Sequence, residues 1–334
     1  MSGLRGFGAR LWGAFDGLAA DTLWGGLHDV AALLAAMTSF VLLNQTLSQA
    51  GYGALFGLYA LVGPLGSLTF AGPGLALLQR RFRHGQDKDE ILRSFLSMTL
   101  LIGLVTSAVA VGLALAFIDL SALEIGLVVA SELFANATIA VCSRLVHAAD
   151  GYPAMMRVRL VVVALRLVAV SALYALDVLT IGNLAGSYLV LYTVYVAWLL
   201  VRRLPAAGYR VALARPTMST ARSSAVFAVP LAASSLQLDG DKFALNAFDY
   251  GAEAGLYGAA YRIVHFGGMP LRVIGNAAFH RFLPDDAVGS SHHLRKSAKL
   301  TALLFLVATG TSAALYLALP VLELLFSEEF AEAR

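Results

Sequence analysis

The sequence predicts an all-α polytopic membrane protein made of two pseudo-repeated six-helix bundles, the second of them truncated. Of the 334 residues, 59% are apolar and 13% are charged, which is about half the charged fraction of an ordinary soluble domain. Uncharged runs recur along the chain, and each approaches the ~20 residues that a helix needs to cross a bilayer. The runs are continuous rather than alternating, which excludes a transmembrane β-barrel.

About nine transmembrane helices are expected, in the order of the apolar runs. They cover approximately residues 23–47, 52–78, 94–118, 122–146, 158–176, 181–201, 224–247, 256–282 and 298–319. Before the first span, apolar residues recur at a helical period, which indicates a short amphipathic helix lying on the membrane. The expected domains are a cytoplasmic amphipathic N-terminus (1–21), an N-terminal six-helix bundle (22–202), a cytoplasmic linker (203–222) and an incomplete C-terminal bundle of three helices (223–334).

The basic residues predict the orientation. Most of the 24 Lys and Arg residues fall in the N-terminal tail and in the loops after even-numbered spans. Positive charge resists translocation, so this side is predicted to be cytoplasmic, together with the N-terminus. The same reasoning explains the basic pI without a nucleic-acid partner.

The connections on the other side are short, and the longest of them covers residues 248–255. They leave no room for an extramembrane catalytic domain. The chain also lacks a phosphate-binding loop, an H-E-x-x-H motif and a cysteine cluster. We therefore expect neither an enzyme nor a metal or cofactor site.

An internal repeat organises the chain. The stretch YGALFGLYALVG, from Tyr52, has a weak counterpart in YGAAYRIVHFG, from Tyr257. The first three spans begin about 200 residues before the last three, as in the parallel repeats of transporters. No length remains after residue 319 for counterparts of spans four to six, so a fragment or a truncated product is expected.

Two charged residues are predicted to lie near the middle of the bilayer. Glu132 in the fourth span and Arg166 in the fifth are on neighbouring antiparallel helices, and we expect them to form an ion pair. The pair could lock the two helices together, or it could be a protonatable switch in a cavity.

The seventh and eighth spans carry a second set of charges. Asp239, Asp241 and Lys242 lie in the outer third of the seventh span. In the eighth, Arg262, His265 and Arg272 share one helical face, which is expected to line a cavity or to meet the other bundle. Arginine suits a phosphate ligand because its planar fork offers paired donors. The alternative for Arg272 is a side chain that reaches the cytoplasmic headgroups.

Three segments resemble a known family. They are LSQAGYGALFGLYALV (47–62), Asp241-Lys242-Phe243 followed by GLYGAAYRIV (255–264), and FSEEFAEA (326–333). They are similar to the polysaccharide-biosynthesis flippases, O-antigen flippases among them, of the multidrug/oligosaccharidyl-lipid/polysaccharide exporter (MOP) superfamily. The resemblance implies two helical bundles around a central cavity in a bacterial inner membrane. Lys242 departs from the arginine that is usual in the family, and FAGPG (70–74) lacks the family's frequent acidic residue.

The function that the resemblance implies is the flipping of a polyprenyl-diphosphate-linked oligosaccharide by alternating access, for lipopolysaccharide or another surface glycan. Arg262, His265, Arg272 and Lys242 would meet the anionic head group, and Glu132, Arg166, Asp239 and Asp241 would couple the cycle or pair structurally. The partners would be this lipid, the bilayer and other membrane proteins of polysaccharide assembly. A multidrug or cation antiporter of the same superfamily, a membrane glycosyltransferase and a transport-inactive truncated remnant are the alternatives.

Overall fold

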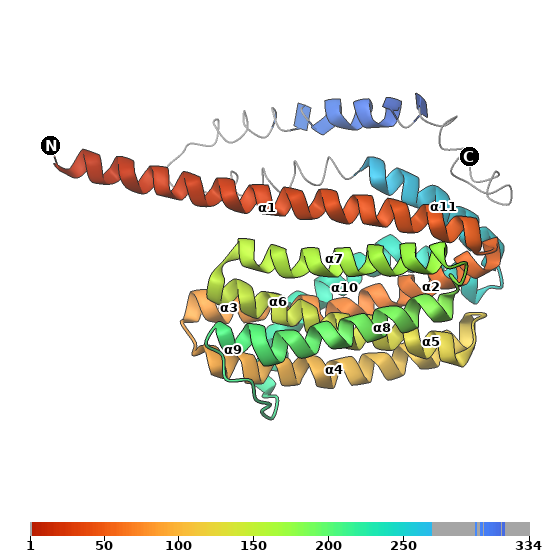
Figure 1. Ribbon diagram of the computed structural model, residues 1–334, viewed down its shortest axis with the longest axis horizontal. Helices are drawn as coiled ribbons and strands as arrows, with labels where there is room; N and C mark the ends of the chain where they lie inside the picture. Colours follow the sequence, from red (N-terminus) through yellow and green to blue (C-terminus); the bar gives the residue numbers. More distant parts are fainter. Residues whose placement is uncertain (1, 269–297, 299–300, 303, 315, 318–334) are drawn as a thin grey trace.

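The computed structural model describes residues 2–268, 298, 301–302, 304–314 and 316–317. Within these residues every regular element is a helix. Figure 1 shows most of the helices running side by side, with the long α1 lying along α7. The elements are α1 (Ser2–Thr46), α2 (Gln49–Gly66), η1 (Ser67–Ala71), α3 (Gly72–His84), α4 (Lys88–Phe117), α5 (Ala122–Val129), η2 (Ala130–Asn136), α6 (Ala137–Asp150), α7 (Tyr152–Ala175), α8 (Ile181–Trp198), η3 (Leu199–Arg203), α9 (Leu204–Ala206), α10 (Met218–Ala247) and α11 (Gly251–Gly267).

The first six predicted spans correspond to helical stretches of the structure. In the described part of the chain, six stretches are long and apolar enough to cross a membrane: Leu23–Thr46, Gln49–His84, Lys88–Phe117, Ala122–Asp150, Tyr152–Ala175 and Ile181–Ala206. The chain is thus an all-α polytopic membrane protein. The seventh predicted span is α10, whose 30 residues are long enough but include Asp239, Asp241 and Lys242. The eighth begins in α11, and a shorter apolar helix, Leu304–Ala314, lies within the ninth.

One predicted boundary is not a break in the backbone. The amphipathic segment 1–21 was expected to be separate from the first span, whereas α1 is one helix of 45 residues from Ser2 to Thr46. The sequence between the two segments contains no proline, and its glycines do not interrupt the helix.

The prolines of the second span produce a π-helical segment instead of an interruption. Pro64 lies inside α2, η1 follows at Ser67, and Pro73 is in the first turn of α3. Proline removes one backbone hydrogen bond, and a π-helical turn accommodates such a local defect without ending the helix. The Thr69 hydroxyl lies 2.8 Å from the Leu65 carbonyl oxygen, to which it donates. The whole stretch Gln49–His84 therefore remains one rod.

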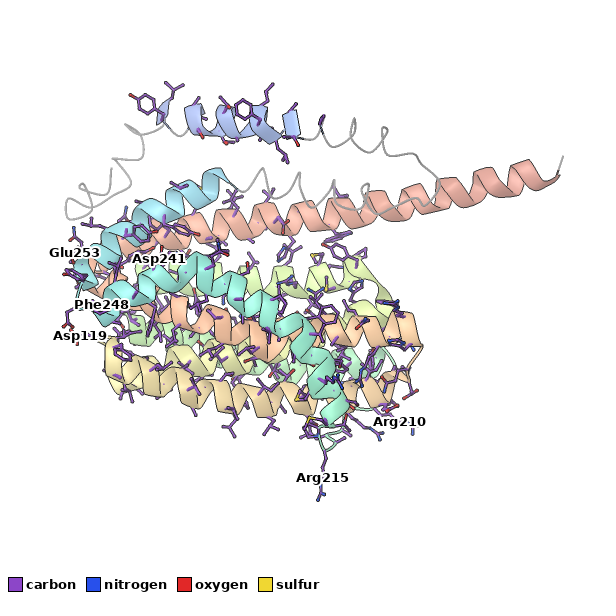
Figure 2. All side chains as sticks on the ribbon, turned by 180° about the vertical axis from the view of Figure 1, so that it is seen from behind. Asp119, Arg210, Arg215, Asp241, Phe248 and Glu253 are labelled. Atoms are coloured by element: carbon purple, nitrogen blue, oxygen red, sulfur yellow. The ribbon has the colours of Figure 1, made fainter. Side chains whose placement is uncertain are left out.

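The two ends of the molecule differ in charge. Figure 2 shows Arg210 and Arg215 at one end, and Asp119, Asp241 and Glu253 at the other. We call these the basic end and the acidic end. The basic end also carries the α3–α4 and α6–α7 connections, as Figure 1 shows. This is the asymmetry from which the sequence predicts the cytoplasmic side.

The helices after the linker pack on α2 and α3 through small residues. Gly53 of α2 faces α11, and a Cβ atom placed on it would lie 1.9 Å from the Gly251 carbonyl oxygen. Gly72 similarly faces Ala228 of α10, with 2.3 Å between an added Cβ and the Cβ of Ala228. Two backbones can approach this closely only where side chains are absent or small. The twin stretches of the repeat thus lie on helices that contact each other.

The predicted linker is docked on the first bundle. Its non-helical part, residues 207–217, crosses the ends of α4 and α6. The buried Tyr209 donates its hydroxyl to the Leu145 carbonyl oxygen at 2.8 Å, and the Ala214 N–H donates to the Ser97 hydroxyl at 3.0 Å. Burial raises the pKa of Tyr209 to about 12. The segment is therefore a strap, whereas its Pro-containing and small-residue composition predicted only a spacer.

Candidate functional site

A cavity of about 420 Å³ lies between the first bundle and the helices after the strap. Small residues of α1 line one side of it. Four aromatic side chains (Phe56, Tyr59, Tyr188 and Tyr261) and two charged ones (Arg166 and Asp239) supply its specific chemistry. Ligand sites are commonly concave and mostly apolar, with a few polar groups that orient the ligand. We take this cavity as the candidate functional site.

The predicted Glu132–Arg166 ion pair is present and borders the cavity. Arg166 of α7 donates from Nη2 to Oε1 of Glu132 at 2.5 Å, and from Nε to the Tyr192 hydroxyl. Asn136 donates to the second carboxylate oxygen of Glu132 at 2.8 Å. The side chain of Glu132 is 8% exposed and that of Arg166 is 37% exposed. The carboxylate is therefore buried behind the guanidinium, which faces the cavity.

The local backbone contributes to this geometry. Glu132 and Asn136 both belong to the π-helical segment η2, and π-helical turns are frequent at functional sites. The Tyr188 and Tyr192 rings of α8 stack on each other, and the Arg166 guanidinium lies 5.7 Å from each ring centroid. Carboxylate, hydroxyl and ring contacts together fix the direction in which Arg166 points.

The second charged group surrounds Lys242 on α10. Its ammonium donates to Asp239 at 2.9 Å and to the Leu238 carbonyl oxygen at 2.6 Å, and it lies 3.3 Å from Asp241. It also sits 3.6 Å from the centroid of the Tyr261 ring, a cation–π contact. The side chain of Lys242 is only 1% exposed. The lysine is thus enclosed by carboxylates and an aromatic ring.

The predicted site residues are only partly brought together. Arg166 and Asp239 line the cavity, and Glu132 lies directly behind Arg166. Lys242, expected to meet substrate, is instead buried beside Asp239 and Asp241. The backbone of α11 includes Arg262 and His265, but their side chains lie outside the described part of the structure, as does Arg272 altogether.

Sequence reasoning missed the aromatic side chains. Tyr188, Tyr192 and Tyr195 recur at helical spacing in SYLVLYTVYV, a signal that places them on one face of α8. Aromatic residues recur at the same spacing before Tyr59 (Tyr52 and Phe56) and before Tyr261 (Tyr257), but nothing local indicates that these faces meet at one cavity, because the helices are far apart in the sequence. In the described residues, no group of three or more His, Cys, Asp or Glu could hold a metal ion.

The fold is that of known transporters. Neither a protein-family model nor a curated protein sequence matches the chain. Among solved structures, the MATE multidrug transporter DinF-BH in complex with R6G is similar, with 13% identity and a TM-score of 0.61 over 91% of this chain and 72% of that one. An inward-facing multidrug resistance MATE family transporter of the MOP superfamily has 15% identity and a TM-score of 0.58, with coverages of 86% and 68%.

A third similar structure has a different pocket. It is a MOP superfamily transporter from Pyrococcus furiosus, for which a binding pocket of reverse polarity suggests a different function. It has 16% identity and a TM-score of 0.60, over 95% of this chain and 73% of that one. These likenesses extend over nearly the whole chain. The chain therefore has the fold of the MOP superfamily transporters, the superfamily that its sequence resembles.

Proposed function

We propose that this chain is a membrane transporter that flips a lipid-linked oligosaccharide by alternating access between its two bundles. The observation that carries the proposal is Arg166, which is fixed by Glu132 and Tyr192 and is 37% exposed at an aromatic-lined cavity. The fold supports a transporter of this superfamily. In this proposal the basic end faces the cytoplasm of a bacterial cell, and the lipid tail remains in the bilayer.

The guanidinium provides the site for a diphosphate. It has five N–H donors. Two of these donors bond to Tyr192 and Glu132. In the described part of the structure, the other donors have no protein acceptor and can bind a ligand. Arginine binds phosphate with paired, charge-assisted hydrogen bonds, which are stronger than neutral ones. Glu132 keeps Arg166 at the wall while the carboxylate itself stays out of the ligand's reach.

The aromatic rings provide the site for sugars. Tyr59, Tyr188 and Tyr261 each combine an apolar ring face with a hydroxyl group. Sugar rings have the same mixture of C–H faces and hydroxyls, so they can pack on such rings and hydrogen-bond at their edges. The Asp239 carboxylate, 37% exposed, can accept hydrogen bonds from further hydroxyls.

A multidrug or cation antiporter is the second candidate, and the Lys242 group favours it. Asp239, Asp241 and the Tyr261 ring already surround one ammonium group, which supports a preference for cations at this place. The similar DinF-BH structure is a multidrug transporter in complex with R6G. For this candidate the important cavity residue is Asp239 rather than Arg166.

Binding measurements on two variants separate the candidates. The purified chain would be titrated with a polyprenyl-diphosphate-linked oligosaccharide and, separately, with R6G. Flippase function predicts that Arg166→Gln weakens oligosaccharide binding at least about tenfold, since a charge-assisted hydrogen bond contributes ~1.5–3 kcal/mol. Asp239→Asn should have a smaller effect on that ligand.

The opposite pattern would reject the flippase. Tight R6G binding that is lost in Asp239→Asn, together with oligosaccharide binding that is unchanged in Arg166→Gln, would identify a cation transporter. The conservative Arg166→Lys keeps the charge without the fork, and it should lose most of the affinity if paired donors matter. Loss of surface polysaccharide in cells that express Arg262→Ala or Arg272→Ala, at normal membrane levels, would extend the site to α11 and beyond.

A further inference from the structure

A group of arginines near the basic end has no role in the cavity. Arg144 lies on α6, six residues before the helix ends at Asp150, and Arg159 lies on α7, seven residues after it begins at Tyr152. At 1.5 Å per residue, both are ~9–11 Å from the ends of their helices. That depth is close to the headgroup region of a bilayer leaflet if the α6–α7 connection lies at the surface.

Arg144 and Arg159 lie at similar depth on α6 and α7, which pack against each other, so their like charges repel. Neither donates a hydrogen bond to, or forms an ion pair with, another residue in the described part of the chain. Arg203, in contrast, has a carboxylate partner, since its Nη2 lies 2.7 Å from Asp150. Like charges placed side by side are unfavourable unless a negative group lies between them.

The acidic group that faces Arg159 is already engaged. Asp29 of α1 interacts electrostatically with Arg159, but its Oδ1 lies 3.0 Å from Nδ1 of His28. Tyr152 interacts with both arginines and is the other titratable group that faces them. Asp29 is thus shared between Arg159 and His28, which leaves the two arginines with excess positive charge.

The neighbouring helices leave space for these side chains. Gly74 of α3 lies under the stem of Arg144, and a Cβ atom added to it would be 3.1 Å from the Arg144 Cγ. Gly25 of α1 faces Tyr152, with 3.1 Å from an added Cβ to the tyrosine hydroxyl. Arg144 is half-buried and Arg159 is exposed, so a ligand can reach both side chains.

We propose that Arg144 and Arg159 bind the phosphate of an anionic lipid headgroup at the basic end, between α1, α6 and α7. Basic pockets between transmembrane helices on the cytoplasmic side commonly bind such headgroups. Two guanidinium forks from adjacent helices can share one phosphate, and the phosphate removes their mutual repulsion. The phosphate can belong to a bulk anionic phospholipid or to a polyprenyl diphosphate, and the site itself does not depend on transport.

The test measures lipid binding by native mass spectrometry of the purified full chain. The probes are phosphatidylglycerol, a polyprenyl diphosphate and phosphatidylcholine, each added to the detergent-solubilised protein. Arg144→Gln and Arg159→Gln should each weaken binding of the anionic probe about tenfold or more, since each removes charge-assisted hydrogen bonds. The matched control is Arg157→Gln, an exposed arginine on the same helix that lies 5.5 Å from the Trp24 ring. It should weaken binding about fivefold or less, the effect of one basic residue near a membrane surface.

Comparing the two anionic lipid probes distinguishes the two sources of phosphate. A stronger effect of the variants on polyprenyl diphosphate than on phosphatidylglycerol assigns the site to the carrier lipid, and the reverse assigns it to the bulk lipid. Equal losses in Arg157→Gln and in the two site variants, or no preference of the wild type for anionic lipid over phosphatidylcholine, would overturn the proposal. If a glutamine variant does not fold, Arg144→Lys and Arg159→Lys carry the comparison, because they keep the charge and lose the fork.

Discussion

Replacing Arg166 by methionine should destabilise the folded chain more than replacing Glu132 by glutamine. Each substitution removes one partner of the same ion pair, but the partner left behind differs. Without Arg166, the Glu132 carboxylate, 8% exposed, remains as a buried charge without its counter-ion. Without the carboxylate, Arg166 is still 37% exposed at the cavity and retains its bond to Tyr192.

The expected magnitudes follow from this asymmetry. Removing one partner of a buried ion pair destabilises a protein by ~3–5 kcal/mol, because an uncompensated charge stays buried. We expect this range for Arg166→Met. For Glu132→Gln we expect ~1–2 kcal/mol, about the loss of one charged hydrogen bond, because water in the cavity solvates the guanidinium and the glutamine can still accept from Asn136. The double variant should lie within ~1–2 kcal/mol of the wild type, since no charge remains.

The assay is thermal unfolding of the detergent-solubilised protein at one scan rate. At ~2 °C per kcal/mol for a chain of this size, Arg166→Met should lower the apparent Tm by about 6–10 °C, and Glu132→Gln by about 2–4 °C. The reasoning is refuted if Glu132→Gln is the more damaging change, or if the double variant is no more stable than Arg166→Met alone.

Two further predictions concern the packing between the bundles and the strap. Gly53→Ala places a methyl group 1.9 Å from the Gly251 carbonyl oxygen, so it should lower stability by at least ~1–3 kcal/mol. The control is Gly26→Ala, which has nothing within 4 Å and should be neutral or slightly stabilising in the same unfolding assay. Equal effects of the two substitutions would contradict the close contact of α2 and α11. Tyr209→Phe removes the hydrogen bond to Leu145, so at neutral pH it should speed tryptic cleavage of the strap several-fold, and unchanged cleavage would contradict the docking. Because burial raises the pKa of Tyr209 to about 12, the stability that the neutral phenol contributes is fully present below its unfolded pKa of about 10 and is lost as the pH rises through about 12. Spectrophotometric titration of Tyr209→Phe should show one late-ionising tyrosine fewer than the wild type.

The sequence was sufficient for the features that depend on local composition. Hydropathy was enough to place the first six spans, because a run of ~20 apolar residues is by itself long enough to cross a bilayer as a helix. The Glu132–Arg166 pair followed from depth alone, since two opposite charges at one level on adjacent helices have few other partners. The flippase-like segments also indicated the superfamily fold.

The remaining features depend on contacts between distant segments. Nothing local to Tyr209 indicates that its hydroxyl reaches Leu145, so the strap resembled a spacer in the sequence. The sequence predicts that Lys242 faces the cavity, but its side chain is buried, and its ion-pair partner Asp239 lines the cavity instead. The aromatic lining joins Tyr59, Tyr188 and other rings only after α2, α8 and α11 come together.

The most direct measurement is translocation of a fluorescent polyprenyl-diphosphate-linked oligosaccharide in proteoliposomes that contain the purified chain. The wild type should move the lipid between leaflets faster than protein-free vesicles, and Arg166→Gln should reduce this rate at least about tenfold while it inserts normally. Wild-type rates equal to those of protein-free vesicles, or rates unaffected by Arg166→Gln, would contradict the proposed flippase and the role of Arg166 in it.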